Sequence, residues 1–413
     1  MNDAVKDYQI FAMTTDPVYI GTGGYTIGRV DNTIVRDPIT KVPKIPGSSL
    51  AGVWRYYTVL EIFSKINNKG IKFIDDNGKS IRERIKYIDK KTIQEKIEEW
   101  IESFNHDNLN NNNKWDTSKW YFFGGNTLLE LNCAGQDNVS QEELSDITAK
   151  NKEGKTGHCG HCLVCKGFGF SKKDISWQGM LYFSDLNILF FPVFTMYGTR
   201  WITTVRRLDE AGLKPNGVDN PTDNKVLTKN GNEGHINLGW LYLGVDETHH
   251  VSLDENIKNI KFENSQLNDT DIVIVPENLF SQIVNSNLEV RTSVSIDPIT
   301  VAAKEGALFT SEAIPRGTIL YGNIRIFDKN SFTGIDDKLA PLPAVESLEC
   351  ALKESKHFFE TLGIGGMTTR GFGRMKIQFR EEIEEKECEE APASSGDAGS
   401  QNDLQENTNG GQQ

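Results

Sequence analysis

The sequence is poor in the features that mark several common protein classes. Only six cysteines occur in 413 residues, too few for the disulfide framework of a secreted protein of this size. No apolar run approaches the roughly 20 residues that a membrane span needs, and Pro192 interrupts the apolar patch at 188–194. No apolar signal segment follows Met1. These absences predict a cytoplasmic protein with no membrane partner.

Signatures of nucleotide triphosphate hydrolysis are also missing. The glycine cluster at 363–374 lacks the Gly-Lys-Ser/Thr end of a Walker A loop. Thr368 stands where a Gly-x-Gly-x-x-Gly fingerprint needs its last glycine. The sequence therefore gives little support to an ATPase or a dinucleotide-binding enzyme.

Negative charge is abundant, but it is concentrated at one end. Residues 381–413 hold ten acidic residues and one lysine, a net charge of −9 out of −13 for the whole chain. The preceding 380 residues carry only −4, and a nearly neutral body can still present a basic groove to nucleic acid. We expect 381–413 to be a disordered acidic tail.

The remaining pattern mixes strands and helices without a strict βαβ period, which favours an α+β fold over residues 1–380. Strand-like alternation begins at 7–15, and a helix is expected from Ser48 or Ser49 to about Asn67. Further helices are expected at 90–104, 201–211, 276–284 and 345–362. The polar stretch at about 65–157 reads as a helical and loop insertion.

Two glycine-containing segments suit contact with a sugar-phosphate backbone. In the first, a turn with Gly23 and Gly24 precedes the expected helix start, where exposed N–H groups favour phosphate. The second segment, 363–374, sets arginines among glycines, which also fits a tight turn at a sheet edge. Its candidate RNA contacts are Gly365, Gly366, Arg370, Gly371 and Arg374.

Four of the cysteines could share one metal ion. Cys159, Cys162 and Cys165 have the short spacing that lets thiolates reach a tetrahedral zinc, and Cys133 lies upstream. An iron–sulfur run would continue with another cysteine where Gly169 stands. The pattern predicts a structural zinc site that Cys133 or a histidine completes, without fixing the fourth ligand; the alternative is reduced thiols without a metal.

Asp31 is the sharpest candidate for catalysis. It lies among polar neighbours in a segment that also contains Val30, Ile34 and Val35, as in an ordered extended arm. Taken alone, an aspartate in a loop is more often a turn or cap residue than a catalyst. The local sequence leaves both readings open.

Taken in order, several short motifs resemble the RAMP superfamily of CRISPR systems. The similarity is greatest to the backbone subunit that cuts target RNA in type III-B (Cmr) effector complexes. Each motif alone is weak, but the ordered series is specific. The series comprises DPVYIGTGG from Asp16, VDNTIVR from Val30, KIPGSSLAG from Lys44, GFGF from Gly167, GMLYFSDLNILFFPV from Gly179, EGALF from Glu305 and GIGGMTTRGFGR from Gly363.

This resemblance implies a modified ferredoxin-like (RRM-related) palm with a β-hairpin thumb, which we place at about 200–245. It implies partners as well: guide CRISPR RNA, target RNA, other Cmr subunits, and further copies of the chain along the guide. The glycine loop at 363–374 and the helix start from Ser48 to Arg55 would hold the guide backbone.

The resemblance also implies an activity. The position that matches the family's catalytic aspartate is Asp31, which would hold a divalent metal, Mg²⁺ or Mn²⁺, or accept the proton of the attacking ribose 2′-hydroxyl. Cleavage at regular intervals would leave a 2′,3′-cyclic phosphate and a 5′-hydroxyl. Relatives commonly have histidine where this chain has Tyr19, so a histidine-dependent step does not carry over. The alternative is a guide-RNA scaffold that does not cut.

Overall fold

The computed structural model describes residues 4–23, 30–68, 133–134, 158, 162–171, 176–213, 218–222, 224–229, 234–247, 260, 262, 268–329 and 342–380. The predicted tail at 381–413, the predicted helix at 90–104 and nearly all of the predicted insertion lie outside these ranges. Among the helices of the described part, none is both long and apolar enough to cross a membrane.

One mixed sheet organises the fold, with the strand order β15-β1-β14-β6-β7-β11-β8-β10-β9. Short strands β2 and β5 join it beside β6 and β14. Its strands are β1 (Val5–Thr14), β2 (Lys44–Ile45), β5 (Leu181–Phe183), β6 (Leu186–Thr195), β7 (Gly198–Thr203), β8 (Lys225–Thr228), β9 (His235–Leu238), β10 (Leu241–Val245), β11 (Ile272–Ile274), β14 (Ile319–Phe327) and β15 (Met375–Phe379). Helices accompany this sheet, which confirms the α+β class.

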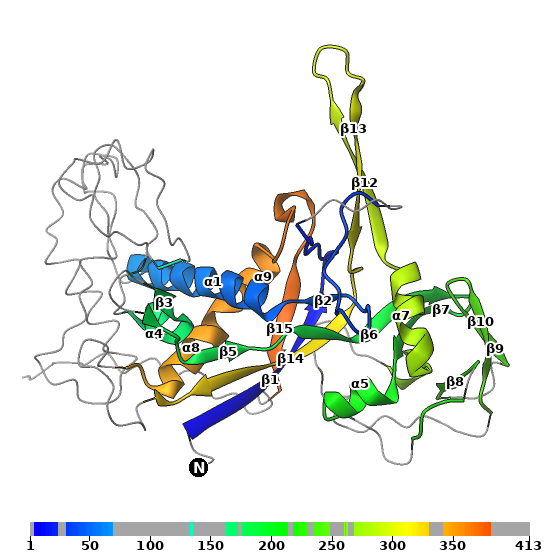
Figure 1. The fold of residues 1–413 in the computed structure, drawn as a ribbon, viewed down its shortest axis with the longest axis horizontal. Coiled ribbons are helices and arrows are strands. Elements are labelled where there is room, and N and C mark those ends of the chain that lie inside the picture. Colours follow the sequence, from blue (N-terminus) through cyan, green and yellow to red (C-terminus); the bar gives the residue numbers. More distant parts are fainter. Residues whose placement is uncertain are drawn as a thin grey trace, which may run out of the picture.

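Two helical groups cover the sheet in different places (Figure 1). One group lies beside β15, β1, β14 and β5, and the other beside β6, β7 and β11. The first consists of α1 (Gly47–Asn68), α4 (Leu163–Phe168), α8 (Val345–Ser355) and α9 (Phe358–Thr361); the second consists of α5 (Val205–Glu210) and α7 (Glu277–Ser286). A small pair, β3 (Phe170–Ser171) with β4 (Ser176–Trp177), follows α4.

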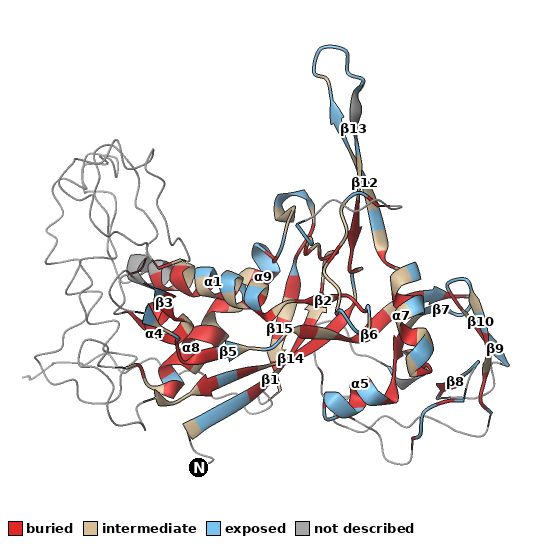
Figure 2. Ribbon diagram, in the orientation of Figure 1, coloured by how far each residue is buried: buried red, intermediate tan, exposed pale blue. Residues whose placement is uncertain are grey.

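The central strands are buried on both faces (Figure 2). On β1, Ile10 and Ala12 belong to one core cluster, whereas Phe11 belongs to a second cluster that includes Leu189 and Phe190 of β6. Side chains of a strand alternate between faces, so a strand that is apolar at consecutive positions needs cover on both. The first helical group and α7 contribute to the first cluster, and α5 contributes Val205 and Leu208 to the second.

A long hairpin stands out from the body of the molecule (Figure 1). It consists of β12 (Glu289–Ile296) and β13 (Ala303–Ala313), which pair only with each other among the described strands. Residues 200–245, where the sequence predicts the thumb, do contain a small hairpin, β9–β10, but β8 joins it to the main sheet. Buried Ile236, Leu238 and Leu243 tie that hairpin to the core. The projecting hairpin therefore lies at 289–313 instead.

Two other sequence predictions change in detail. Residues 201–211, expected as one helix, divide into the end of β7 and the short helix α5, because Trp201 to Thr203 pair with β11. The helix expected to start at Ser48 or Ser49 begins at Gly47, whose N–H donates to Asp185 Oδ1 at 2.8 Å. A Cβ at position 47 would collide with the Phe183 carbonyl, so only glycine fits this approach.

Trp54 anchors α1 in the first core cluster. It is fully buried, and its indole N–H lies 3.2 Å from the Leu352 carbonyl and 3.1 Å from Ser355 Oγ on α8. Its ring packs against Phe359 and Phe379, with ring centroids 5.1 and 6.1 Å away. One side chain thus joins α1, α8, α9 and β15.

Trp54→Ala is expected to lower the free energy of unfolding by about 3–5 kcal/mol, because it leaves a large cavity and an unpaired carbonyl. Urea titration followed by far-ultraviolet circular dichroism measures the change. Trp240→Ala is the matched control, since Trp240 is 70% exposed on the β9–β10 turn, and its effect should stay within about 0.5 kcal/mol. Equal losses in the two variants would contradict the anchoring role of Trp54.

Candidate nucleic-acid interface

A short extended arm, residues 30–36, lies along β13 near the base of the projecting hairpin; it is part of the dark blue segment between β1 and α1 in Figure 1. Asn32 forms a parallel bridge with Ser311, its N–H donates to the Thr310 carbonyl at 3.0 Å, and its carbonyl accepts from the Glu312 N–H at 3.0 Å. Val30 and Ile34 are buried on either side. The arm is an ordered neighbour of the hairpin, as the alternating sequence predicts.

Asp31 is exposed on this arm, and its carboxylate is held by the hairpin. Asp31 Oδ2 accepts from the Thr310 backbone N–H at 2.8 Å and from the Thr310 hydroxyl at 2.9 Å. These bonds, the backbone one first, hold the pKa of Asp31 below its ordinary range. The result is a solvent-facing carboxylate that is ionised at neutral pH and has a fixed orientation.

A partly buried ion pair fixes the other end of the arm. Arg36 donates to Glu312 Oε2 at 2.7 Å and to Asn285 Oδ1 of α7 at 2.9 Å. The same Glu312 oxygen lies 3.4 Å from the Ile34 N–H. Because Glu312 and Thr310 both belong to β13, one strand sets both the path of the arm and the orientation of Asp31.

The two glycine segments of the sequence meet each other in space. The Gly366 N–H donates to the Tyr19 carbonyl at 3.0 Å, and the Gly373 N–H donates to the Pro17 carbonyl at 2.8 Å. Gly365 has a φ of 83°, and a Cβ there would collide with the same Tyr19 carbonyl. Glycine is thus required at 365 for a close backbone approach.

The glycine loop presents two arginines and also touches the hairpin. Arg370 is exposed, and Arg374 lies 3.4 Å from Asp16 while remaining half exposed. Arg291 of β12 donates to the Gly371 carbonyl at 3.2 Å and lies 4.7 Å from the centre of the Phe372 ring. Arg291 is also the cross-strand partner of Ser311, which pairs with the arm. Arm, hairpin base and glycine loop are therefore joined by direct contacts.

Other residues predicted to contact RNA lie in different settings. Gly23 has a φ of 75° and open space around it, and Gly24 lies outside the described residues. Ser48 is exposed and Ser49 half-buried in the first turn of α1, and the arm reaches this helix through the bridge between Arg36 and Pro43. The Tyr19 ring lies against Gly21 and Gly366, where added Cβ atoms would contact it.

Arg55 is engaged inside the protein. Its guanidinium donates to the carbonyls of Cys133 and Gly169 at 2.6 and 2.7 Å and lies 2.9 Å from His158 Nδ1. These contacts use the donors that an RNA backbone would need, so we leave Arg55 out of the interface. Nothing in the sequence around Arg55, which lies within α1, indicates these internal contacts.

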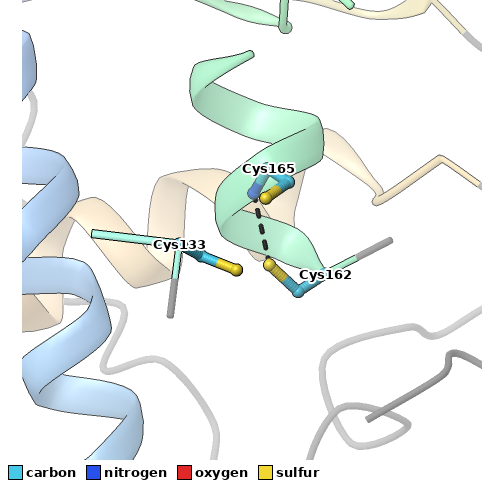
Figure 3. A group of neighbouring side chains, drawn as sticks. All are labelled: Cys133, Cys162 and Cys165. Carbon is cyan, nitrogen blue, oxygen red and sulfur yellow. Dashed lines mark hydrogen bonds between the residues drawn. The ribbon is translucent and has the colours of Figure 1, made fainter. Parts of the chain in front are cut away.

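Three of the four cysteines predicted as metal ligands come together. Cys133, Cys162 and Cys165 are buried, and their sulfur atoms all lie within 4.8 Å of one another (Figure 3). Cys159 lies outside the described residues. This cysteine cluster is part of the helical side of the molecule, beside α1, and is separate from the arm that carries Asp31.

The sequence analysis missed Thr310, Glu312 and Arg291. Each contacts the arm or the glycine loop from about 80 to 280 positions away in the chain. None belongs to a recognisable motif, and threonine, glutamate and arginine are ordinary strand-surface residues. Only pairing between the arm and β13 reveals them.

Thr310→Val should raise the pKa of Asp31 toward its ordinary value, because one of the two donors from Thr310 is removed while the backbone N–H remains. The shift is measurable by carbon-detected NMR titration of the Asp31 carboxyl. Thr292→Val is the control, since Thr292 is the cross-strand partner of Thr310 on β12. An unchanged Asp31 titration in Thr310→Val would contradict the assigned hydrogen bond.

A comparison with solved structures matches this chain to a type III-B Cmr-beta complex and to Cmr4. A chain of a Cmr-beta complex in its apo state, studied by cryo-electron microscopy, gives a TM-score of 0.47 at 13% identity over 91% of this chain and 98% of that chain. A chain of oligomeric Cmr4 from Pyrococcus furiosus gives 0.41 at 17% identity over 91% and 99%. With TM-scores below 0.5, these similarities support no inference about function.

No curated protein matches the chain. The family model of the RAMP superfamily, in contrast, matches residues 11–376. This range includes the arm, the projecting hairpin, the cysteine cluster and the glycine loop. The chain therefore belongs to the RAMP superfamily.

Proposed function

We propose that this protein is the repeated backbone subunit of a type III-B CRISPR ribonucleoprotein, and that it cuts complementary target RNA with Asp31. Membership of the RAMP superfamily and the ordered motifs support the assignment. The observation that carries the catalytic part is the exposed, ionised carboxylate of Asp31, oriented by Thr310 of the hairpin. A turn or cap aspartate would bond to its own segment, whereas Asp31 bonds to a strand 279 residues away.

The guide RNA backbone would follow the glycine loop. Gly365 and Gly366 would fix the loop against Tyr19, so that Gly371 and the exposed Arg370 and Arg374 face the guide and supply positive charge to phosphates. Gly23, Gly24 and the first turn of α1 with Ser48 and Ser49 would add N–H and hydroxyl donors. Other Cmr subunits and further copies of this chain along the guide complete the proposed assembly.

The projecting hairpin would act as the thumb of the palm. Its outer part exposes Ile296, Ile299, Val301 and Leu308, with Ile299 89% exposed. Apolar side chains on a narrow projection suit insertion between base steps, which kinks a duplex. Leu308 lies on β13 two residues from Thr310, so a kink made at Leu308 would lie beside Asp31.

The reaction is transesterification within the target strand. The ribose 2′-oxygen attacks the adjacent phosphorus, the 2′-hydroxyl proton passes to solvent, and the bond to the 5′-oxygen breaks as that oxygen is protonated. The products are a 2′,3′-cyclic phosphate and a 5′-hydroxyl. The lowered pKa makes Asp31 a weak general base, so its role would be to hold Mg²⁺ or Mn²⁺, which would stabilise negative charge on the reacting phosphate. The kinked strand provides in-line alignment.

Asp31→Asn should abolish cleavage while leaving target binding intact, because it removes the negative charge and keeps the shape. The complex is assembled with guide RNA, complementary labelled target and Mg²⁺, and products are resolved on a gel. Wild type should give an evenly spaced ladder, and the variant at least about 100-fold slower cutting, since a bound metal contributes several kcal/mol. Asp7→Asn, on an exposed β1 carboxylate paired with Arg325, is the control.

Two results would change the proposal. An unchanged ladder in Asp31→Asn would overturn the catalytic assignment. If wild type bound target RNA normally but did not cut it with Mg²⁺ or Mn²⁺, the result would favour the second candidate function, a guide-RNA scaffold that does not cut.

Arg370→Ala should weaken guide RNA binding roughly five-fold at about 0.1 M salt and lower the slope of log affinity against log salt by about 0.7, as expected for one phosphate contact to a single strand. Filter binding over a salt series measures both quantities. Arg206→Ala is the control, since Arg206 is exposed on α5 and pairs with Glu210. An unchanged slope would exclude Arg370 from the phosphate contacts.

A further inference from the structure

The cysteine cluster brings together thiols from two distant parts of the chain. Cys133 lies 29 positions before Cys162, and both are at most 1% exposed, as is Cys165. In Figure 3 the three side chains point toward one another, Cys162 from the start of α4 and Cys165 from within that helix. All three sulfur atoms lie within 4.8 Å of one another. Among the described residues, this is the group of potential ligands that meets the geometric requirement for a metal.

The spacing fits a tetrahedral zinc ion. A zinc–sulfur bond is about 2.3 Å long, so two thiolates on one tetrahedral ion lie roughly 3.8 Å apart. The sulfurs therefore need to move by less than about 1 Å to bind. The Cys162 sulfur also accepts from the Cys165 N–H at 3.3 Å. This bond orients one sulfur and stabilises negative charge on it.

A guanidinium lies beside the sulfurs. Arg55 is 3.8 Å from Cys165 Sγ, and it bonds to the carbonyl of Cys133 and to that of Gly169 just after α4. Three thiolates on one divalent ion leave a net negative charge, and a cation in contact with them offsets it. Arg55 also donates toward His158 Nδ1, so that nitrogen faces the arginine and not a metal.

Simple packing explains the arrangement less well. Buried thiols do pack like small apolar side chains. Apolar packing, however, gives no reason for an arginine next to the Cys165 sulfur, bonded to the Cys133 and Gly169 carbonyls. A charged group next to buried sulfur is favourable when the sulfur itself is charged. Metal-bound thiolates meet that condition at neutral pH.

We propose that Cys133, Cys162 and Cys165 bind a structural zinc ion, and that Arg55 is its positioning residue. The metal joins the two ends of the segment between Cys133 and Cys162 and fixes both to α1 through Arg55. It takes no part in RNA cleavage, since the cluster lies on the helical side of the molecule, apart from the arm. The site stands whether or not Asp31 cuts RNA.

The first test is metal content of the full chain, purified without chelator and measured by inductively coupled plasma mass spectrometry. Wild type should contain about one zinc per chain, and Cys162→Ser and Cys133→Ser should lose most of it. Cys350→Ser, on α8 outside the cluster, should keep it. Zinc far below one per wild-type chain, or unchanged zinc in Cys162→Ser, would overturn the proposal.

Cobalt replacement keeps the test decisive if the serine variants do not fold. Wild type loaded with Co²⁺ should show the intense thiolate-to-metal charge-transfer absorption of a tetrahedral sulfur-rich site; its absence would overturn the assignment. Arg55→Gln should weaken zinc affinity by about 10–100-fold in chelator competition, with Arg206→Gln as control. Equal affinity in Arg55→Gln and wild type would remove Arg55 from its positioning role.

Discussion

The pairing of the arm with β13 is the constraint on which the candidate site depends. Residues 30–36 form no named strand. Asn32 bonds to β13 on both sides of Ser311, and Thr33 and Val35 bond to the backbone at 20–22 and at Lys44. The Arg36–Glu312 ion pair and the buried side chain of Ile34 stabilise the same contact between the arm and β13. Without this pairing, Asp31 would lose both donors from Thr310, and with them its orientation and its lowered pKa. The position of one carboxylate is therefore a property of the hairpin base.

The glycine loop depends on an equally close contact. Gly365 approaches the Tyr19 carbonyl so closely that a side chain would not fit, and Gly373 donates its N–H to the Pro17 carbonyl. Arg291 then connects the loop to β12. Three segments that are far apart in the chain, at its beginning, at the hairpin and near its end, thus form one surface. A subunit that grips a guide strand and presents a neighbouring target phosphate needs these parts at fixed separations.

Much of the fold follows from local patterns in the sequence. Alternation at 7–15 predicts β1, and the helix expected from Ser48 or Ser49 to about Asn67 corresponds to α1. The Cys-x-x-Cys spacing, with Cys133 added, identifies the cysteine cluster. These features depend on neighbours within a few positions, or on a residue type rare enough to stand out.

What the sequence does not reveal depends on long-range pairing. Trp201 to Thr203 carry a pattern compatible with helix, but their place between β6 and β11 makes them a strand. Asp185, which caps α1 from 138 positions away, displaces the helix start from Ser48 to Gly47. Residues 200–245 and 289–313 both contain hairpins, and only the burial of the first and the absence of further sheet partners for β12–β13 among the described strands show which of the two projects. From the sequence alone, Arg55 would be taken for a surface residue, because its contacts with Cys133, Gly169 and Cys165 join residues far apart in the chain.

The place of β1 in the sheet has a consequence for how the chain is made. β1 pairs with β14 on one side and with β15 on the other, so its partners lie about 310 and 365 residues downstream. At the usual 5–20 residues per second of synthesis, the first strand leaves the ribosome roughly 20–70 s before its last partner. Strands with such distant partners fold slowly, and unpaired edges invite association with other chains. β1 carries the polar residues Lys6, Asp7 and Gln9. Before β14 and β15 are synthesised, these side chains make association of the unpaired strand with other chains less favourable.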